Sequence, residues 1–195
     1  MIVGIAGAYC AGKNSVAEAF AEESFHIVDV DRIGHEVLEE NRERVIQAFG
    51  TDVLSTEGGI NRQILGQIVF RSPKMLEELE RIVHPGMVAR VREIVEKKQE
   101  RVVINAAVLF KMGLHKLCDV VICVTAPIIT RMRRAIARDS LSFRQALQRI
   151  WPQRGICPKT NSEDVDIYFV RNSGNKDRLK AEVKSFLQGR NEYGK

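Results

Sequence analysis

Long apolar runs and paired cysteines are both absent from this chain of 195 residues. No stretch of about 18 apolar residues is available to span a membrane, and the N-terminal segment lacks the basic and hydrophobic regions of a signal peptide. The scattered cysteines form no CxxC pair, so neither a disulfide framework nor a zinc site is indicated. We therefore expect a cytoplasmic protein without a membrane partner, in which Cys118 and Cys123 are core thiols.

Aromatic residues are also scarce, at 6% of the chain, and few of them lie in the segment where positive charge is concentrated. Residues 126–154 hold seven arginines and one acid, Asp139, a net charge of +6 against +5 for the whole chain. Arginine favours bidentate recognition of phosphate. Because stacking on bases would need more aromatics than Phe143 and Trp151, we expect a phosphorylated small molecule as partner and no nucleic acid.

Short apolar segments alternate with helical patterns along the chain. Predicted strands lie at 1–6, 26–30, 101–106, 119–124 and 166–170. They are nearly continuously apolar, which is typical of parallel strands buried on both faces. The periodicity predicts helices at 13–23, 31–40, 42–49, 62–70, 73–98, 128–138, 142–150 and 176–188. The pattern predicts an α/β fold with a five-stranded parallel sheet flanked by helices.

Two connections between the predicted strands are longer than one crossover helix requires. Residues 31–100 form a near-neutral helical insertion, and residues 126–160 form an arginine-rich helical lid. The length of the chain suits one full core, so we predict a single domain over 1–195 that carries both additions.

The stretch GAYCAGKNS, which follows the first predicted strand, has the spacing of a phosphate-binding loop. Gly7 and Gly12 allow backbone amides to converge on phosphate oxygens, the following helix adds positive charge, and Lys13 reaches the terminal phosphates. The loop predicts that ATP binds here. Asn14 replaces the hydroxyl residue that usually binds Mg²⁺, and its amide oxygen is a weaker ligand. The replacement therefore affects the predicted metal site more than nucleotide binding.

Two aspartates, Asp29 and Asp31, come at the carboxyl end of the second predicted strand, where open parallel sheets place their ligands. A carboxylate there can orient an attacking hydroxyl, because phosphoryl transfer depends mostly on positioning and charge neutralisation. Asp31 is the better candidate. It also fits the role of an N-cap for the helix that follows.

Several further segments resemble one enzyme family in order and over nearly the whole chain. They are VDVDRIG, NRQILGQIVF, LERIVHPGMV, VVINAAVLFKMG, RAIARD, ALQRIWPQ and RNSG. Together with the loop they look like dephospho-CoA kinase. The resemblance implies transfer of the ATP γ-phosphate to the ribose 3'-hydroxyl of dephospho-CoA, the last step of coenzyme A biosynthesis. It also implies that the insertion binds the CoA moiety and that the lid is mobile.

The resemblance assigns roles to individual positions. Lys13, Asp31 and Arg138 are the expected catalytic residues, with Asp31 facing the acceptor hydroxyl and Arg138 in the lid near the phosphates. The expected nucleotide contacts are Cys10, Ala11, Gly12, Lys13, Asn14, Ser15, Arg138 and Asn172, and those to dephospho-CoA are Asp31, Arg62, His84, Leu109 and Phe110. Other interpretations stay open: His84 precedes a proline and fits a helix kink, Leu109 and Phe110 fit an ordinary core, and Arg62 fits a solvated helix face.

The chain departs from the family pattern after the third predicted strand. Asn105 stands where the family commonly has an acid, and Lys111 replaces another acid. Two positions on the metal side, 14 and 105, are therefore both amides, and Asp29 or Asp31 is expected to carry more of the Mg²⁺ contact. Two alternatives remain: a different nucleotide or small-molecule kinase, and a non-catalytic nucleotide-binding regulator. A protein that only binds a nucleotide would not need both Asp31 and Arg138, which argues against the regulator.

Overall fold

The structure, a computed structural model, describes residues 1–97, 101–139, 142–151, 156–158 and 164–193. The arginine-rich segment predicted at 126–160 therefore lies partly outside the described residues, including Arg154. Two compact units divide the chain. Met1–Asp29 with Val95–Lys195 forms the first, the sheet unit, and Val30–Ile94 forms the second, the helical unit.

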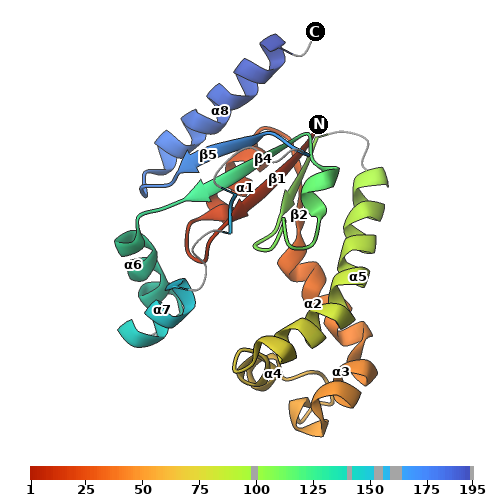
Figure 1. The fold of residues 1–195 in the computed structure, drawn as a ribbon. Coiled ribbons are helices and arrows are strands. Elements are labelled where there is room, and N and C mark those ends of the chain that lie inside the picture. Colours follow the sequence, from red (N-terminus) through yellow and green to blue (C-terminus); the bar gives the residue numbers. More distant parts are fainter. Residues whose placement is uncertain (98–100, 140–141, 152–155, 159–163, 194–195) are drawn as a thin grey trace. The chain divides into compact units, whose positions relative to one another are not determined.

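A five-stranded parallel sheet forms the centre of the sheet unit (Figure 1). Its strands are β1 (Ile2–Gly7), β2 (His26–Asp29), β3 (Val102–Asn105), β4 (Val120–Thr125) and β5 (Ile167–Arg171), in the order β2-β3-β1-β4-β5. Asn105 pairs in register with Ile5 on one side and Asp29 on the other. The predicted parallel α/β sheet is confirmed, and its register aligns the carboxyl ends of β2, β3 and β1.

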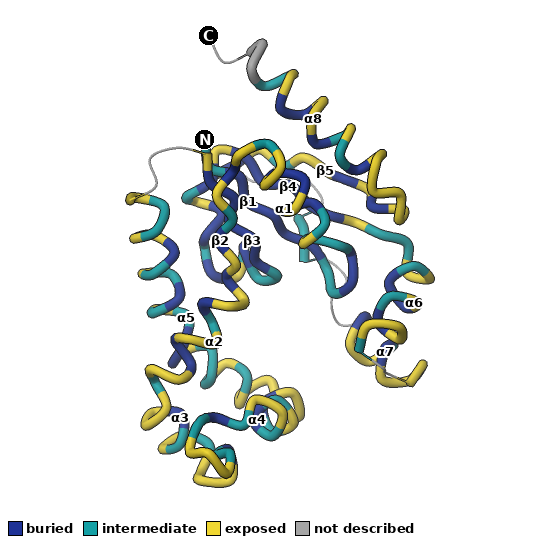
Figure 2. The backbone as a smooth tube through the Cα atoms, turned by 180° about the vertical axis from the view of Figure 1, so that it is seen from behind, coloured by how far each residue is buried: buried dark blue, intermediate teal, exposed yellow. Residues whose placement is uncertain are grey.

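Burial differs between the central strands and the edge strands. The central strands β3, β1 and β4 are almost entirely buried, as the dark blue of Figure 2 shows. In β5, Tyr168 and Phe169 are 40% and 47% exposed. The prediction that the strands are buried on both faces was wrong for β2 and β5, because side chains of an edge strand lie at the margin of the layers that cover the sheet faces.

Helices α1 (Lys13–Glu22) and α8 (Lys176–Tyr193) cover one face of the sheet. Phe20 of α1 is fully buried there, with ring centroids 5.0 Å from Phe25 and 6.3 Å from Phe186 of α8. Helix α8 continues to Tyr193, five residues past its predicted end. Its apolar residues pack on α1 and the sheet, and they join the two helices to a single core.

The other face of the sheet is packed by the segment that follows β3. A Cβ atom at Gly4 would lie 2.8 Å from Leu109 Cδ2 and 2.9 Å from Cys118 Sγ, so this segment approaches β1 as closely as glycine allows. A short 3₁₀ helix, η2 (Leu114–Leu117), follows. Cys118 and Cys123 are both buried and unpaired in disulfides, which confirms that they are core thiols.

Two further helices of the sheet unit, α6 (Ile128–Asp139) and α7 (Phe143–Ile150), pack together on a small apolar cluster. Ser142 begins α7 with a capping box: its side chain accepts from the Gln145 backbone N–H, and the Gln145 side chain accepts from the Ser142 N–H. The cluster contains residues from both helices and from the phosphate loop: Tyr9, Cys10, Met132, Ala135, Ala146, Leu147 and Ile150.

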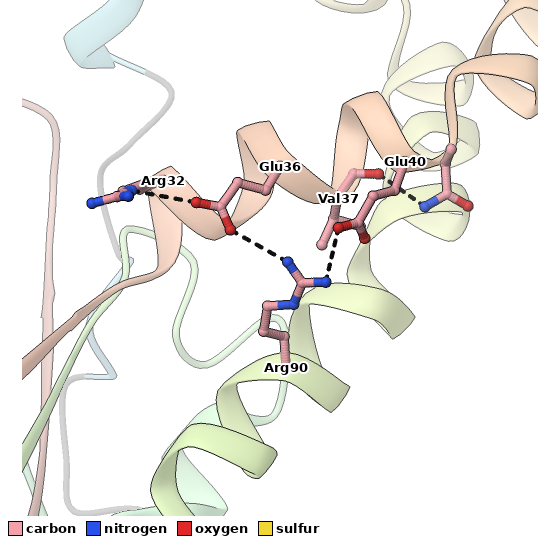
Figure 3. Close-up of polar contacts among 6 residues, drawn as sticks. Arg32, Glu36, Val37, Glu40 and Arg90 are labelled. Atoms are coloured by element: carbon pink, nitrogen blue, oxygen red, sulfur yellow. Dashed lines mark hydrogen bonds and ion pairs between the residues drawn. The ribbon is translucent and has the colours of Figure 1, made fainter.

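The helical unit contains α2 (Val30–Glu40), α3 (Arg42–Phe49), a 3₁₀ turn η1 (Thr51–Val53) and α4 (Arg62–Val69), together with most of α5 (Pro73–Lys97). Arg90 of α5 donates to Glu36 at 3.3 Å and to Glu40 at 2.8 Å, which ties α5 to α2 (Figure 3). Helix α5 continues through Pro85 without ending.

No helix in the described part of the chain combines the length and apolar character that a membrane crossing requires.

Candidate active site

The loop between β1 and α1 depends on its two glycines. A Cβ atom at Gly7 would lie 2.7 Å from the carbonyl oxygen of Val124, and one at Gly12 would overlap the side-chain amide of Asn172. Gly12 and Cys10 both adopt positive φ angles, 98° and 59°, so two left-handed residues fold the chain back just before the helix. The backbone is therefore shaped into a compact turn at the carboxyl end of β1.

The first turn of α1 supplies the anion-binding groups of this turn. Backbone N–H groups at a helix start have no carbonyl partner within the helix, and Gly12 provides no side-chain cap. Lys13 Nζ lies 3.3 Å from the Gly7 carbonyl oxygen, so the ammonium lies back over the loop. The helix N-terminus and Lys13 together place positive charge where a phosphate would bind.

Two amides face each other, one in the first turn of α1 and one at the carboxyl end of β3. Asn105 Nδ2 donates to Asn14 Oδ1 at 3.0 Å. Asn105 is 6% exposed, and its Oδ1 atom accepts no hydrogen bond from the described residues. Asp29, the register neighbour of Asn105, adds an exposed carboxylate at the same edge of the sheet. These groups are hard oxygen ligands, so the residues present fit Mg²⁺.

Three arginines of α6 contact the loop. Arg131, Arg134 and Arg138 are spaced three and four residues apart and so share one helix face. Arg131 Nε donates to the Tyr9 carbonyl at 2.8 Å, and Arg134 Nη1 donates to the Ala11 carbonyl at 3.1 Å. Arg131 and Arg134 were absent from the predicted site. Their spacing with Arg138 on a predicted helix nevertheless indicates that the three arginines share one face.

Asn172 is joined to the loop through Arg134. The Asn172 Oδ1 atom accepts from Arg134 Nη2 at 3.0 Å and from the Gly174 backbone N–H at 3.0 Å. The backbone N–H of Asn172 donates to the Thr125 carbonyl at 2.7 Å. The structure thus brings Asn172, just after β5, against Gly12. The predicted nucleotide contacts on the loop and at Asn172 lie in one place.

Arg138 lies beside the loop but is paired within its own helix. Its Nε and Nη2 atoms donate to the Asp139 carboxylate at 2.8 and 3.0 Å, and its guanidinium lies 5.3 Å from the ring centroid of Tyr9. The hydrogen bonds from Arg138 and then from Tyr9 lower the pKa of Asp139 to about 2. Asp139 is therefore a carboxylate at any physiological pH.

A pair of thiols lies near Lys13, which the scattered cysteines did not suggest. Cys157 is hydrogen-bonded to Cys123 of β4, and this contact, with a smaller contribution from the Lys13 ammonium, lowers the pKa of Cys157. The same contact and burial raise the pKa of Cys123. Within the loop, burial raises the pKa of Cys10, so its thiol stays protonated.

The predicted acceptor residues are divided between the two units. Leu109 is fully buried against Gly4, and the Phe110 ring lies 5.1 Å from His115. The other three belong to the helical unit: Asp31 is exposed in the first turn of α2, Arg62 is exposed at the first position of α4, and His84 is half-buried in α5.

Comparison with known proteins gives consistent matches. The family model described as dephospho-CoA kinase matches residues 1–177. The dephospho-CoA kinase of Borreliella burgdorferi is 30% identical over 194 residues, with 97% of this chain and 94% of that protein covered. That of Dehalococcoides mccartyi is 37% identical over 158 residues, with 78% of this chain and 80% of that protein covered. The crystal structure of TT1252 from Thermus thermophilus superposes with a TM-score of 0.80 at 25% identity, covering 97% of both chains.

Proposed function

Because the chain belongs to the dephospho-CoA kinase family, we propose that it transfers the γ-phosphate of ATP to the ribose 3'-hydroxyl of dephospho-CoA, in the last step of coenzyme A biosynthesis. The family match over residues 1–177 is the observation that carries this proposal. The glycine-shaped turn with Lys13 at the start of α1 is the part of the molecule that suits it chemically.

In this proposal the loop and α1 hold the triphosphate. The N–H groups of the first helical turn donate to phosphate oxygens, and the Lys13 ammonium neutralises the terminal phosphates. The proposed nucleotide contacts remain Cys10 to Ser15 along the loop, with Asn172 beside the base. Arg134 keeps Asn172 and the loop together through its bonds to Ala11 and Asn172.

Arg138 is proposed to neutralise charge that develops on the transferred phosphoryl group. It projects from the same face of α6 as the two arginines that hold the loop carbonyls. Closure of α6 and α7 over ATP would exclude water and so limit wasteful hydrolysis. The bidentate contact with Asp139 fixes the orientation of the Arg138 guanidinium.

Asp31 is proposed to orient the 3'-hydroxyl and to accept its proton. It follows the last residue of β2, Asp29, by two positions along the chain. The remaining proposed contacts to dephospho-CoA are Arg62, His84, Leu109 and Phe110. Since the Leu109 side chain is fully buried against Gly4, it would contribute to the acceptor site through packing. A cytoplasmic location belongs to the same proposal.

Mg²⁺ is proposed to be held by the amide oxygens of Asn14 and Asn105 and by the Asp29 carboxylate, directly or through water. The unsatisfied Asn105 Oδ1 supports this assignment. Bound between these side chains and the triphosphate, the metal would supply positive charge that offsets the negative charge of the phosphates.

The experiment is incubation of the protein with ATP, Mg²⁺ and either dephospho-CoA or a panel of nucleosides and nucleotides, followed by mass analysis of the products. A mass increase of one phosphate on dephospho-CoA supports the proposal. Phosphorylation of a different acceptor would point to another kinase, and ATP binding without any product would point to a regulator.

A matched pair of lysine variants tests the role of the loop. Lys13→Met should lower kcat by roughly a hundredfold or more, because it removes charge from the phosphate site. Lys184→Met is the control, since Lys184 of α8 pairs with Glu23, the C-cap residue of α1, at 3.5 Å and lies outside the proposed site. Equal activity of the two variants would contradict the proposed role of Lys13.

A further inference from the structure

Tyr9 is a residue of the phosphate loop whose side chain contacts both α6 and α7. Its hydroxyl donates a hydrogen bond to the Asp139 carboxylate, and it accepts from Arg149 Nη1 of α7 at 3.4 Å. Its carbonyl accepts from Arg131 at 2.8 Å. One loop residue therefore contacts both helices through its side chain and its backbone.

The Tyr9 ring is also placed between two guanidinium groups. Arg138 and Arg149 lie 5.3 and 5.9 Å from the ring centroid, within the range of cation–π attraction. The same two arginines neutralise Asp139, directly at 2.8 Å for Arg138 and at 3.9 Å for Arg149. The aromatic ring, the acid and the two bases form one connected cluster.

Apolar contacts between the loop and the two helices lie beside this polar cluster. Tyr9 and Cys10 pack against Met132, Ala135 and Ile150, and the last two are fully buried. Burial and the bond to Asp139 raise the pKa of Tyr9, so its hydroxyl remains a donor at neutral pH. The loop is thus part of the small core that joins α6 to α7.

We propose that Tyr9 is a positioning residue that couples the phosphate loop to α6 and α7 and orients Arg138 by holding Asp139. The Asp139 carboxylate binds the Nε–Nη2 edge of Arg138, so fixing Asp139 fixes the direction of that guanidinium. Movement of the loop around a nucleotide would be transmitted to Arg138 through the Tyr9 hydroxyl. The catalytic readout of this inference rests on the proposed kinase function.

The test compares Tyr9→Phe, which keeps the ring and loses the hydroxyl, with Asp139→Asn and with the double variant. Tyr9→Phe should lower kcat by roughly tenfold, the range for loss of a hydrogen bond to a charged group, with KM for dephospho-CoA unchanged. The ratio of ATP hydrolysed to dephospho-CoA phosphorylated should rise. The double variant should be no slower than the slower single variant, because both changes break one contact.

Tyr168→Phe is the matched control, since it removes a tyrosine hydroxyl from the exposed edge strand β5. It should retain the wild-type kcat. A kcat for Tyr9→Phe within twofold of wild type, or multiplicative effects in the double variant, would overturn the inference.

A second measurement does not depend on catalysis. Amide hydrogen exchange in Ile128–Asp139 and Phe143–Ile150 should be faster in Tyr9→Phe than in wild type, with the strand amides unchanged. Unchanged exchange in both helices would overturn the coupling. If wild type makes no phosphorylated product, the proposed function fails, and this exchange comparison still decides the coupling.

Discussion

Gly12 has a left-handed backbone conformation, and the side-chain amide of Asn172 occupies the space that a Cβ atom at Gly12 would need. Gly12→Ala should therefore destabilise the protein by about 1–3 kcal/mol and weaken ATP binding, because the loop must move away from Asn172. Urea unfolding and ATP titration measure the two effects. Gly189→Ala in α8, where a Cβ atom meets nothing within 4 Å, should leave stability unchanged or raise it by up to about 1 kcal/mol. Equal stability of the two variants would contradict the steric account of Gly12.

Asn14 is the residue whose identity departs most clearly from an ordinary phosphate loop. If its amide oxygen lies near the metal, Asn14→Ser should lower the Mg²⁺ concentration needed for half-maximal activity, by roughly tenfold. ATP affinity measured without metal should not change. An unaltered Mg²⁺ titration would show that position 14 does not contact the ion or its water shell.

At the scale of elements, Asp139 makes the contact between α6 and the loop depend on pH. Its neighbours Arg138, Tyr9 and Arg149 lower its pKa from 3.8 to about 2. A carboxyl with a lower pKa in the folded state stabilises that state fully above its unfolded pKa, and this contribution is lost as pH falls through about 2. The stability difference between wild type and Asp139→Asn should therefore be constant above about pH 4 and disappear towards pH 2.

Trp151, the single tryptophan of the chain, directly follows α7 and provides the signal for this comparison. The measurement is the urea midpoint of Trp151 fluorescence for both proteins between pH 2 and 6. A difference that persists at pH 2 would contradict the assigned pKa and its cause.

The elements themselves were predictable to within a few residues, because apolar runs and helical periodicity are local properties. The loop was also predictable, since Gly7, Gly12 and Lys13 lie close together in sequence between a strand and a helix. The contact of Tyr9 with Asp139 was not, because it joins residues 130 positions apart. The proximity of Cys157 to Cys123 has the same origin: packing, and not spacing, brings these residues together.

At the scale of the whole molecule, the proposed reaction requires an acceptor-side acid in addition to the phosphate loop. Asp31→Asn should lower kcat by roughly a hundredfold or more while ATP affinity stays nearly unchanged, because the amide cannot accept the hydroxyl proton. Asp52→Asn is the matched control, an exposed aspartate of η1 in the same helical unit. Retained turnover in Asp31→Asn would remove this residue from the proposed mechanism.

Transfer of the terminal phosphate of ATP to one defined hydroxyl is the central claim. The most direct measurement uses γ-labelled ATP with dephospho-CoA and locates the label in the isolated product. We predict that the label is on the ribose 3'-oxygen and that Lys13→Met slows its incorporation by roughly a hundredfold or more. Label found only in inorganic phosphate, or on any acceptor other than dephospho-CoA, would contradict the account.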